Sequence, residues 1–179
     1  AFKFALEYER GLVLSPTASG KSLIIYMLCR HYLNMINNNI LIIVPTTSLV
    51  EQLYKDFKDY GYDVETNVSR KYHGYDIDED KRIVISTWQS LYKMPKKFFE
   101  DYGAVIGDEA HLFKAVSLTK IMTKLTDCKY RIGLTGTLDD SKTHKLVLQG
   151  LFGTVNRVVS TKQLIDKKQL SDFKIECLV

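Results

Sequence analysis

The sequence of 179 residues predicts an α/β protein built as a three-layer sandwich, with a mostly parallel central sheet between two layers of helices. Two observations carry this prediction. Short apolar runs alternate with longer segments whose apolar residues recur at helical spacing, and this alternation favours parallel strands joined by right-handed crossovers. Several of the runs are also apolar at nearly every position, which is typical of strands buried on both faces of a sheet.

The first half of the chain supplies the clearest elements. In chain order we expect a strand at 11–14, a helix beginning near Leu23, a strand at 40–44, a helix at 49–60, an exposed strand at 62–68, a surface loop at 71–81 and a strand at 82–86. The three asparagines at 37–39 end the first helix, because asparagine tolerates turn conformations. The spacing of Tyr54, Phe57 and Tyr60 predicts that all three pack the second helix against the sheet.

The second half continues the alternation. After a basic, aromatic segment at 92–102 we expect a strand at 104–107, a helix at 116–125, a strand at 130–134, a helix at 142–151, a strand-like piece at 155–160, a short helix at 161–167 and a second strand-like piece at 172–179. Polar motifs follow five of the apolar runs. In parallel sheets ligands gather at the carboxyl ends of the strands, so these motifs are expected to form one composite site.

Composition narrows the class of protein. Hydrophobic residues at 45% and charged residues at 26% describe a globular chain, and they exclude a disordered or fibrous one. No apolar stretch approaches the roughly 20 residues that a membrane helix needs. The net charge of +4 permits an anionic partner such as nucleic acid. Three widely spaced cysteines suggest free thiols in a reducing compartment, and the start, which lacks Met, suggests the cut boundary of a longer chain.

A phosphate-binding loop is predicted between the first strand and the first helix. The segment 15–22 ends in Gly-Lys-Ser, although Ser15 stands where the usual pattern has glycine. In such loops the lysine, here Lys21, reaches the β- and γ-phosphates, and the following hydroxyl, here Ser22, binds Mg²⁺. The residues expected to surround the phosphates are Pro16, Thr17, Ala18, Ser19, Gly20, Lys21 and Ser22.

Two adjacent carboxylates follow the apolar run 104–107. Asp108 is placed to hold Mg²⁺, and Glu109 to orient and deprotonate an attacking water. An Asp-Glu pair on its own is more often a solvated turn. Its position after a buried strand and downstream of a phosphate loop favours a magnesium-dependent nucleoside triphosphatase instead.

Five ordered segments together resemble the first RecA-like domain of superfamily 2 helicases, and within that superfamily the phage branch-migration helicases. The segments are 15–22, 45–53, 86–91, the Asp-Glu-Ala-His box at 108–111, and Leu-Thr-Gly-Thr at 134–137. The resemblance implies a RecA-like P-loop NTPase that uses ATP and Mg²⁺. It also implies an ATP-binding domain at 1–160, followed at 161–179 by a segment leading to a second RecA-like domain outside this chain.

The resemblance also implies roles for residues outside the nucleotide loop. Residues of two segments would contact the backbone of DNA with little sequence preference, namely Thr46, Thr47, Thr87, Trp88 and Gln89. Helix capping by the three threonines is the structural alternative. Thr135, Gly136 and Thr137 would link hydrolysis to domain movement, with His111 bridging this segment and the γ-phosphate.

The resulting expectation is the motor domain of an ATP-dependent DNA helicase or translocase that remodels branched DNA in recombination, replication or repair. The host cell would be a phage-infected bacterium and the compartment its cytoplasm. By itself the chain would be weakly active or inactive, because in this family the second domain supplies an arginine finger. The alternatives are an RNA helicase, a non-catalytic nucleic-acid-binding module with a vestigial nucleotide pocket, and a small-molecule phosphotransferase, for which residues 86–89 give no support.

Overall fold

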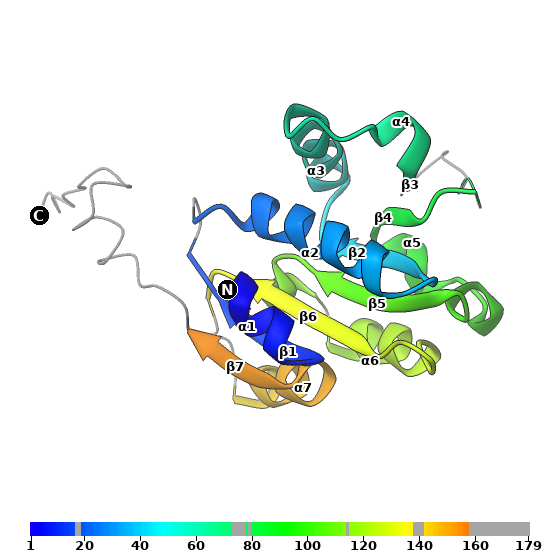
Figure 1. The fold of residues 1–179 in the computed structure, drawn as a ribbon. Helices are drawn as coiled ribbons and strands as arrows, with labels where there is room; N and C mark the ends of the chain where they lie inside the picture. Colours follow the sequence, from blue (N-terminus) through cyan, green and yellow to red (C-terminus); the bar gives the residue numbers. More distant parts are fainter. Residues whose placement is uncertain (17–18, 73–77, 79, 114, 138–141, 158–179) are drawn as a thin grey trace, which may run out of the picture.

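The computed structural model describes residues 1–16, 19–72, 78, 80–113, 115–137 and 142–157. In this part of the chain, seven strands form one sheet in the order β3-β4-β2-β5-β6-β1-β7, and every neighbouring pair is parallel (Figure 1). The strands are β1 (Arg10–Leu14), β2 (Asn39–Val44), β3 (Val68–Lys71), β4 (Ile83–Thr87), β5 (Tyr102–Gly107), β6 (Tyr130–Thr135) and β7 (Thr154–Arg157). The predicted parallel sheet is confirmed.

Helices cover both faces of the sheet and give it three layers. They are α1 (Phe2–Glu7), α2 (Lys21–Met35), α3 (Thr47–Asp59), α4 (Val64–Asn67), α5 (Trp88–Tyr92), α6 (Ala115–Lys124) and α7 (Lys142–Phe152), with short 3₁₀ turns η1 (Lys96–Phe99) and η2 (Ala110–Leu112). One buried cluster joins α2 and α3 to the sheet, and a second joins α5, α6 and α7 to its other face. The predicted sandwich is therefore confirmed.

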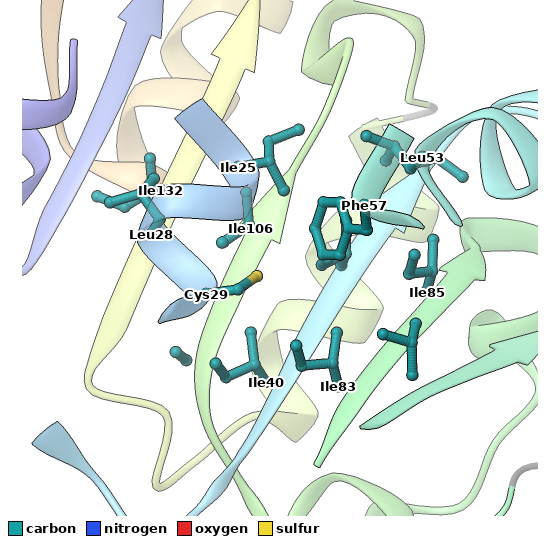
Figure 2. Packing of buried hydrophobic residues seen from close by; sticks show 14 of the residues in the cluster. Ile25, Leu28, Cys29, Ile40, Leu53, Phe57, Ile83, Ile85, Ile106 and Ile132 are labelled. Carbon is teal, nitrogen blue, oxygen red and sulfur yellow. The ribbon is translucent and has the colours of Figure 1, made fainter. Parts of the chain in front are cut away.

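Alternating side chains of the central strands feed these two clusters. Ile40 and Ile42 of β2 pack under α2 and α3, whereas Leu41 and Ile43 belong to the opposite cluster. Figure 2 shows the first cluster, in which Phe57 of α3 lies among isoleucines of the strands. Because β2 is buried on both faces, its sequence is apolar at every position after Asn39.

On the other face, Phe152 of α7 lies over two strand glycines. A Cβ added to Gly107 of β5 would come within 2.9 Å of the Phe152 ring, and one added to Gly133 of β6 within 3.0 Å of it. Phe152 is fully buried. The glycines thus provide the space that lets this aromatic ring approach the two strands closely.

The prediction of an exposed strand at 62–68 is wrong. Asp63 caps a single helical turn, α4, by accepting a hydrogen bond from the Thr66 N–H at 3.2 Å, and strand β3 begins only at Val68. A short aspartate cap therefore outweighs the weak strand pattern of this segment. Helix α1 was not anticipated from the sequence either.

The remaining predictions at the chain's end and in its loop fall mostly outside the described residues. These are the helix at 161–167, the strand-like piece at 172–179, the end of the piece at 155–160 and most of the loop at 71–81. Cys29 and Cys128 are buried free thiols. Among the described residues, no helix combines the length and apolarity needed to cross a bilayer.

Candidate functional site

The polar motifs converge at the carboxyl ends of neighbouring strands. The N–H of Ser15, just after β1, donates to the Thr135 carbonyl at the end of β6 at 2.9 Å. The N–H of Asp108, just after β5, donates to the Ile43 carbonyl of β2 at the same distance. Segments separated by up to about two thirds of the chain in sequence are therefore held together by hydrogen bonds of a single sheet.

The predicted phosphate loop joins β1 to the first turn of α2. Ser15 is buried, and its hydroxyl lies 2.6 Å from that of Ser19, which donates to the Pro16 carbonyl at 2.6 Å. Gly20 has a φ of 78°, a left-handed conformation that glycine adopts without strain. The serine that departs from the usual pattern thus makes bonds inside the loop. Thr17 and Ala18 lie outside the described residues.

Lys21 and Glu109 form an ion pair across the site. Lys21 Nζ lies 2.5 Å from Glu109 Oε1, and their side chains are only 10% and 19% exposed. Glu109 has a φ of 48°, which is unusual for a residue other than glycine, and such backbone strain clusters at functional sites. The geometry brings the predicted phosphate-binding lysine and the predicted catalytic base into direct contact.

Asp108 is a buried carboxylate at the end of β5. Burial raises its pKa to about 6, with the nearby charge of Glu109 adding to the increase and that of Lys21 opposing it. Its Oδ1 accepts a hydrogen bond from the Glu109 N–H at 3.0 Å. Asp108 and Ser22 offer hard oxygen donors of the kind Mg²⁺ prefers, and a buried negative charge favours a cation, so this donor set fits the ion.

We expect Asp108→Asn to raise the free energy of unfolding of the metal-free chain. Asparagine keeps an oxygen for the Glu109 N–H but cannot ionise. The pKa of Asp108 is about 6 in the folded chain, against an ordinary value of 3.8. The stability that the neutral carboxyl gives the fold is therefore complete below the lower value, and it is lost as the pH rises through the higher one. The gain from the substitution should reach about 3 kcal/mol above that range.

Urea titrations in EDTA at about pH 5 and about pH 8 would test this, with roughly half of the gain present at the lower pH. Asp59→Asn, at an exposed position on α3, is the control and should change little at either pH. A gain for Asp108→Asn that does not grow with pH would contradict the prediction.

His111 connects the Asp-Glu-Ala-His box to the Thr-Gly-Thr segment. Its Nδ1 lies 2.7 Å from Thr135 Oγ1. The Thr135 hydroxyl donates its hydrogen bond to the Thr137 carbonyl at 2.8 Å, so the histidine N–H is the donor to Thr135. His144 Nε2 in turn lies 3.1 Å from the His111 carbonyl. Gly136 is partly exposed between the two threonines. His111, Thr135 and Thr137 are therefore linked by a chain of hydrogen bonds.

The segment before α3 is exposed at the same edge of the sheet. Thr46 caps α3 by accepting from the Leu49 N–H at 3.3 Å, and Thr47 opens the helix. Both threonines are exposed. Capping leaves other N–H groups of the first turn directed outward, where an anion can bind them.

The segment before α5 is more enclosed. Thr87 is buried and caps α5 through its contact with the Ser90 N–H at 3.4 Å. Gln89 is exposed and donates to the Pro45 carbonyl at 3.2 Å, so it ties this segment to the one before α3, while Trp88 is partly buried. The structure thus brings the two predicted DNA-binding segments together, with Thr46, Thr47 and Gln89 on the surface.

Tyr60 is a site residue that the sequence did not indicate. Helical spacing predicted that it would pack with Tyr54 and Phe57, which are buried, but Tyr60 is 38% exposed. Its hydroxyl lies 2.9 Å from that of Ser22. Nothing in the spacing distinguishes this tyrosine from its neighbours, because only the crossing of α3 over α2 brings it to the loop.

The family described as "Type III restriction enzyme, res subunit" (ResIII) matches residues 2–140. The chain is 35% identical over 174 residues to the ATP-dependent DNA helicase uvsW of Enterobacteria phage T4. This match covers 95% of this chain and 35% of the relative. It is 32% identical over 147 residues to the ATP-dependent DNA helicase Hel308 of Methanocaldococcus jannaschii, covering 71% of this chain and 12% of that relative.

Among solved structures, the crystal structure of the UvsW helicase from bacteriophage T4 is similar with a TM-score of 0.82 at 34% identity. The match covers 88% of this chain and 57% of that one. The chain thus spans about a third of the length of the phage relative and a smaller part of the archaeal one.

Proposed function

We propose that this chain is the ATP-binding half of a DNA-translocating motor. The premise is its family: the chain belongs to the ResIII family and is the first RecA-like domain of a superfamily 2 helicase. Residues 1–160 would form the ATP-binding domain, and residues 161–179 would lead to a second RecA-like domain of a longer protein. The nucleotide would lie between the two domains. The isolated chain is therefore expected to bind ATP and to hydrolyse it weakly or not at all.

One observation carries this proposal: motifs distant in sequence are in direct contact at one edge of the sheet. Lys21 meets Glu109 at 2.5 Å, and His111 meets Thr135 at 2.7 Å. A nucleotide loop, an acidic pair and a relay segment joined in this way are what hydrolysis coupled to movement requires.

Each side chain has a proposed part in hydrolysis. Lys21 and the loop N–H groups bind the phosphates, and Glu109 accepts a proton from the attacking water. Ser22 and Asp108 would hold Mg²⁺, which supplies charge stabilisation at the phosphates when bound. His111 would report the state of the γ-phosphate to Thr135, Gly136 and Thr137, because its ring already hydrogen-bonds this segment.

DNA is the proposed track. The exposed Thr46, Thr47 and Gln89 would contact its sugar-phosphate backbone, with Thr87 and Trp88 shaping the second segment. Such contacts give little sequence preference. Similarity to an ATP-dependent DNA helicase of phage T4 supports DNA as the track. Branched DNA as the substrate, a role in recombination, replication or repair, and action in the cytoplasm of an infected bacterium are further parts of the proposal.

ATPase activity of the full-length enzyme tests this proposal. The assay would compare no nucleic acid with single-stranded, duplex and branched DNA and with RNA of matched length. We expect DNA to stimulate hydrolysis, branched DNA most strongly. Stimulation by RNA alone would indicate an RNA helicase, and DNA binding without any hydrolysis would indicate a module with a vestigial nucleotide pocket; either result would contradict the proposal.

A further inference from the structure

The Tyr60 hydroxyl reaches into the nucleotide loop from a different helix. Tyr60 follows the last residue of α3, and its hydroxyl lies 2.9 Å from Ser22 Oγ in the first turn of α2. Ser22 is also the proposed Mg²⁺ ligand. The chain therefore places a second hydroxyl directly on a group that would bind the metal.

The ring of Tyr60 is held independently of this hydrogen bond. Its centroid lies 5.4 Å from that of Tyr26, which also contacts Phe57 at 5.3 Å and Tyr62 at 5.8 Å. The Tyr26 hydroxyl accepts from Arg30 Nη1 at 3.0 Å. Because the contact with Tyr26 restricts the Tyr60 ring, its hydroxyl is presented to Ser22 by packing as well as by the hydrogen bond itself.

We infer that Tyr60 is a positioning residue for Ser22, an assignment that rests on the proposed function. A serine hydroxyl has one proton and two lone pairs and rotates freely unless a partner directs it. When the Ser22 hydroxyl donates its hydrogen bond to the Tyr60 oxygen, the lone pairs of Ser22 are left for a cation. Metal ligands commonly depend on such outer partners for their orientation.

The two ends of α3 lie at two different parts of the site. The helix begins at Thr47, beside the proposed DNA-binding segment, and its C-terminal residue precedes Tyr60. A helix of this length is a rigid rod of about 20 Å. Tyr60 thus couples the orientation of the Ser22 hydroxyl to the position of α3, the helix that begins at the proposed DNA-binding segment.

Equilibrium binding of a non-hydrolysable ATP analogue to the full-length enzyme tests the inference, once with Mg²⁺ and once with EDTA. Tyr60→Phe removes only the hydroxyl and keeps the ring. We expect the dissociation constant to rise about threefold to tenfold with Mg²⁺, the size of one hydrogen bond, and to stay unchanged in EDTA. In a Ser22→Ala background, Tyr60→Phe should have no further effect.

Tyr62→Phe is the matched control, because it removes a hydroxyl from the same aromatic cluster, and it should leave binding unchanged in both conditions. Equal weakening of Tyr60→Phe with and without Mg²⁺ would reveal a purely structural role and overturn the inference, as would wild-type affinity in both. If the wild-type enzyme fails to bind the analogue at all, the proposed function falls and this inference falls with it.

Discussion

Glu109→Gln in the full-length enzyme is expected to lower DNA-stimulated ATP hydrolysis by about 10²–10⁴-fold, because glutamine cannot accept a proton from the attacking water. The substitution keeps the size of the side chain and leaves Lys21, Ser22 and Asp108 in place. Binding of a non-hydrolysable ATP analogue should therefore be at least as tight as in the wild type, because Lys21 loses its ion-pair partner. Steady-state hydrolysis and equilibrium binding, measured on the same preparation, would separate the two effects.

Two further variants sharpen this test. Lys21→Ala should lose both hydrolysis and tight binding of the analogue, because the ammonium that meets the phosphates is gone. Glu100→Gln changes an exposed glutamate after η1 and should behave as wild type. Wild-type turnover in Glu109→Gln would remove Glu109 from the catalytic role proposed for it.

Phe152→Ala is expected to have the largest effect on stability. The ring is fully buried, lies over Gly107 and Gly133, and leaves a cavity between α7 and two strands when it is removed. Deleting a buried phenylalanine costs about 3–5 kcal/mol. Urea unfolding followed by circular dichroism should show this as a lower free energy of unfolding with a similar dependence on urea concentration.

Leu146→Ala on the same helix is the matched control. Leu146 is 67% exposed, so its truncation should change the free energy of unfolding by no more than about 0.5 kcal/mol. Equal effects of the two substitutions would show that Phe152 is not the contact that fastens α7 to the sheet.

Much of the fold could be predicted because its strands are buried on both faces. The run 40–44 is apolar throughout and stands between two amphipathic segments, and so has few alternatives to a central parallel strand. The order of the strands could not be predicted in this way, because the apolar runs are alike and carry no information about their neighbours. The turn at Asp63 was missed because a single side-chain cap decides it.

In the candidate site, too, residues marked by a local sequence pattern could be predicted, whereas contacts that depend on the packing of distant segments could not. Lys21, Asp108 and Glu109 could be proposed as site residues because each follows an apolar run in a recognisable local pattern. The ion pair between Lys21 and Glu109 was not predicted, since it joins residues 88 positions apart and depends on the strand order. Tyr60 was missed for the same reason: its contact with Ser22 arises from how two helices cross.

The ion pair also bears on how a nucleotide enters. A triphosphate and the Glu109 carboxylate are rivals for one ammonium group, and the protein's own carboxylate is always present. The apparent affinity for ATP is then the intrinsic affinity reduced by the fraction of molecules in which Lys21 is released. In the proposed mechanism, ATP would therefore have to separate the Glu109 carboxylate from Lys21 before that carboxylate acts as the base. A stronger ion pair would then mean a weaker apparent affinity for the nucleotide.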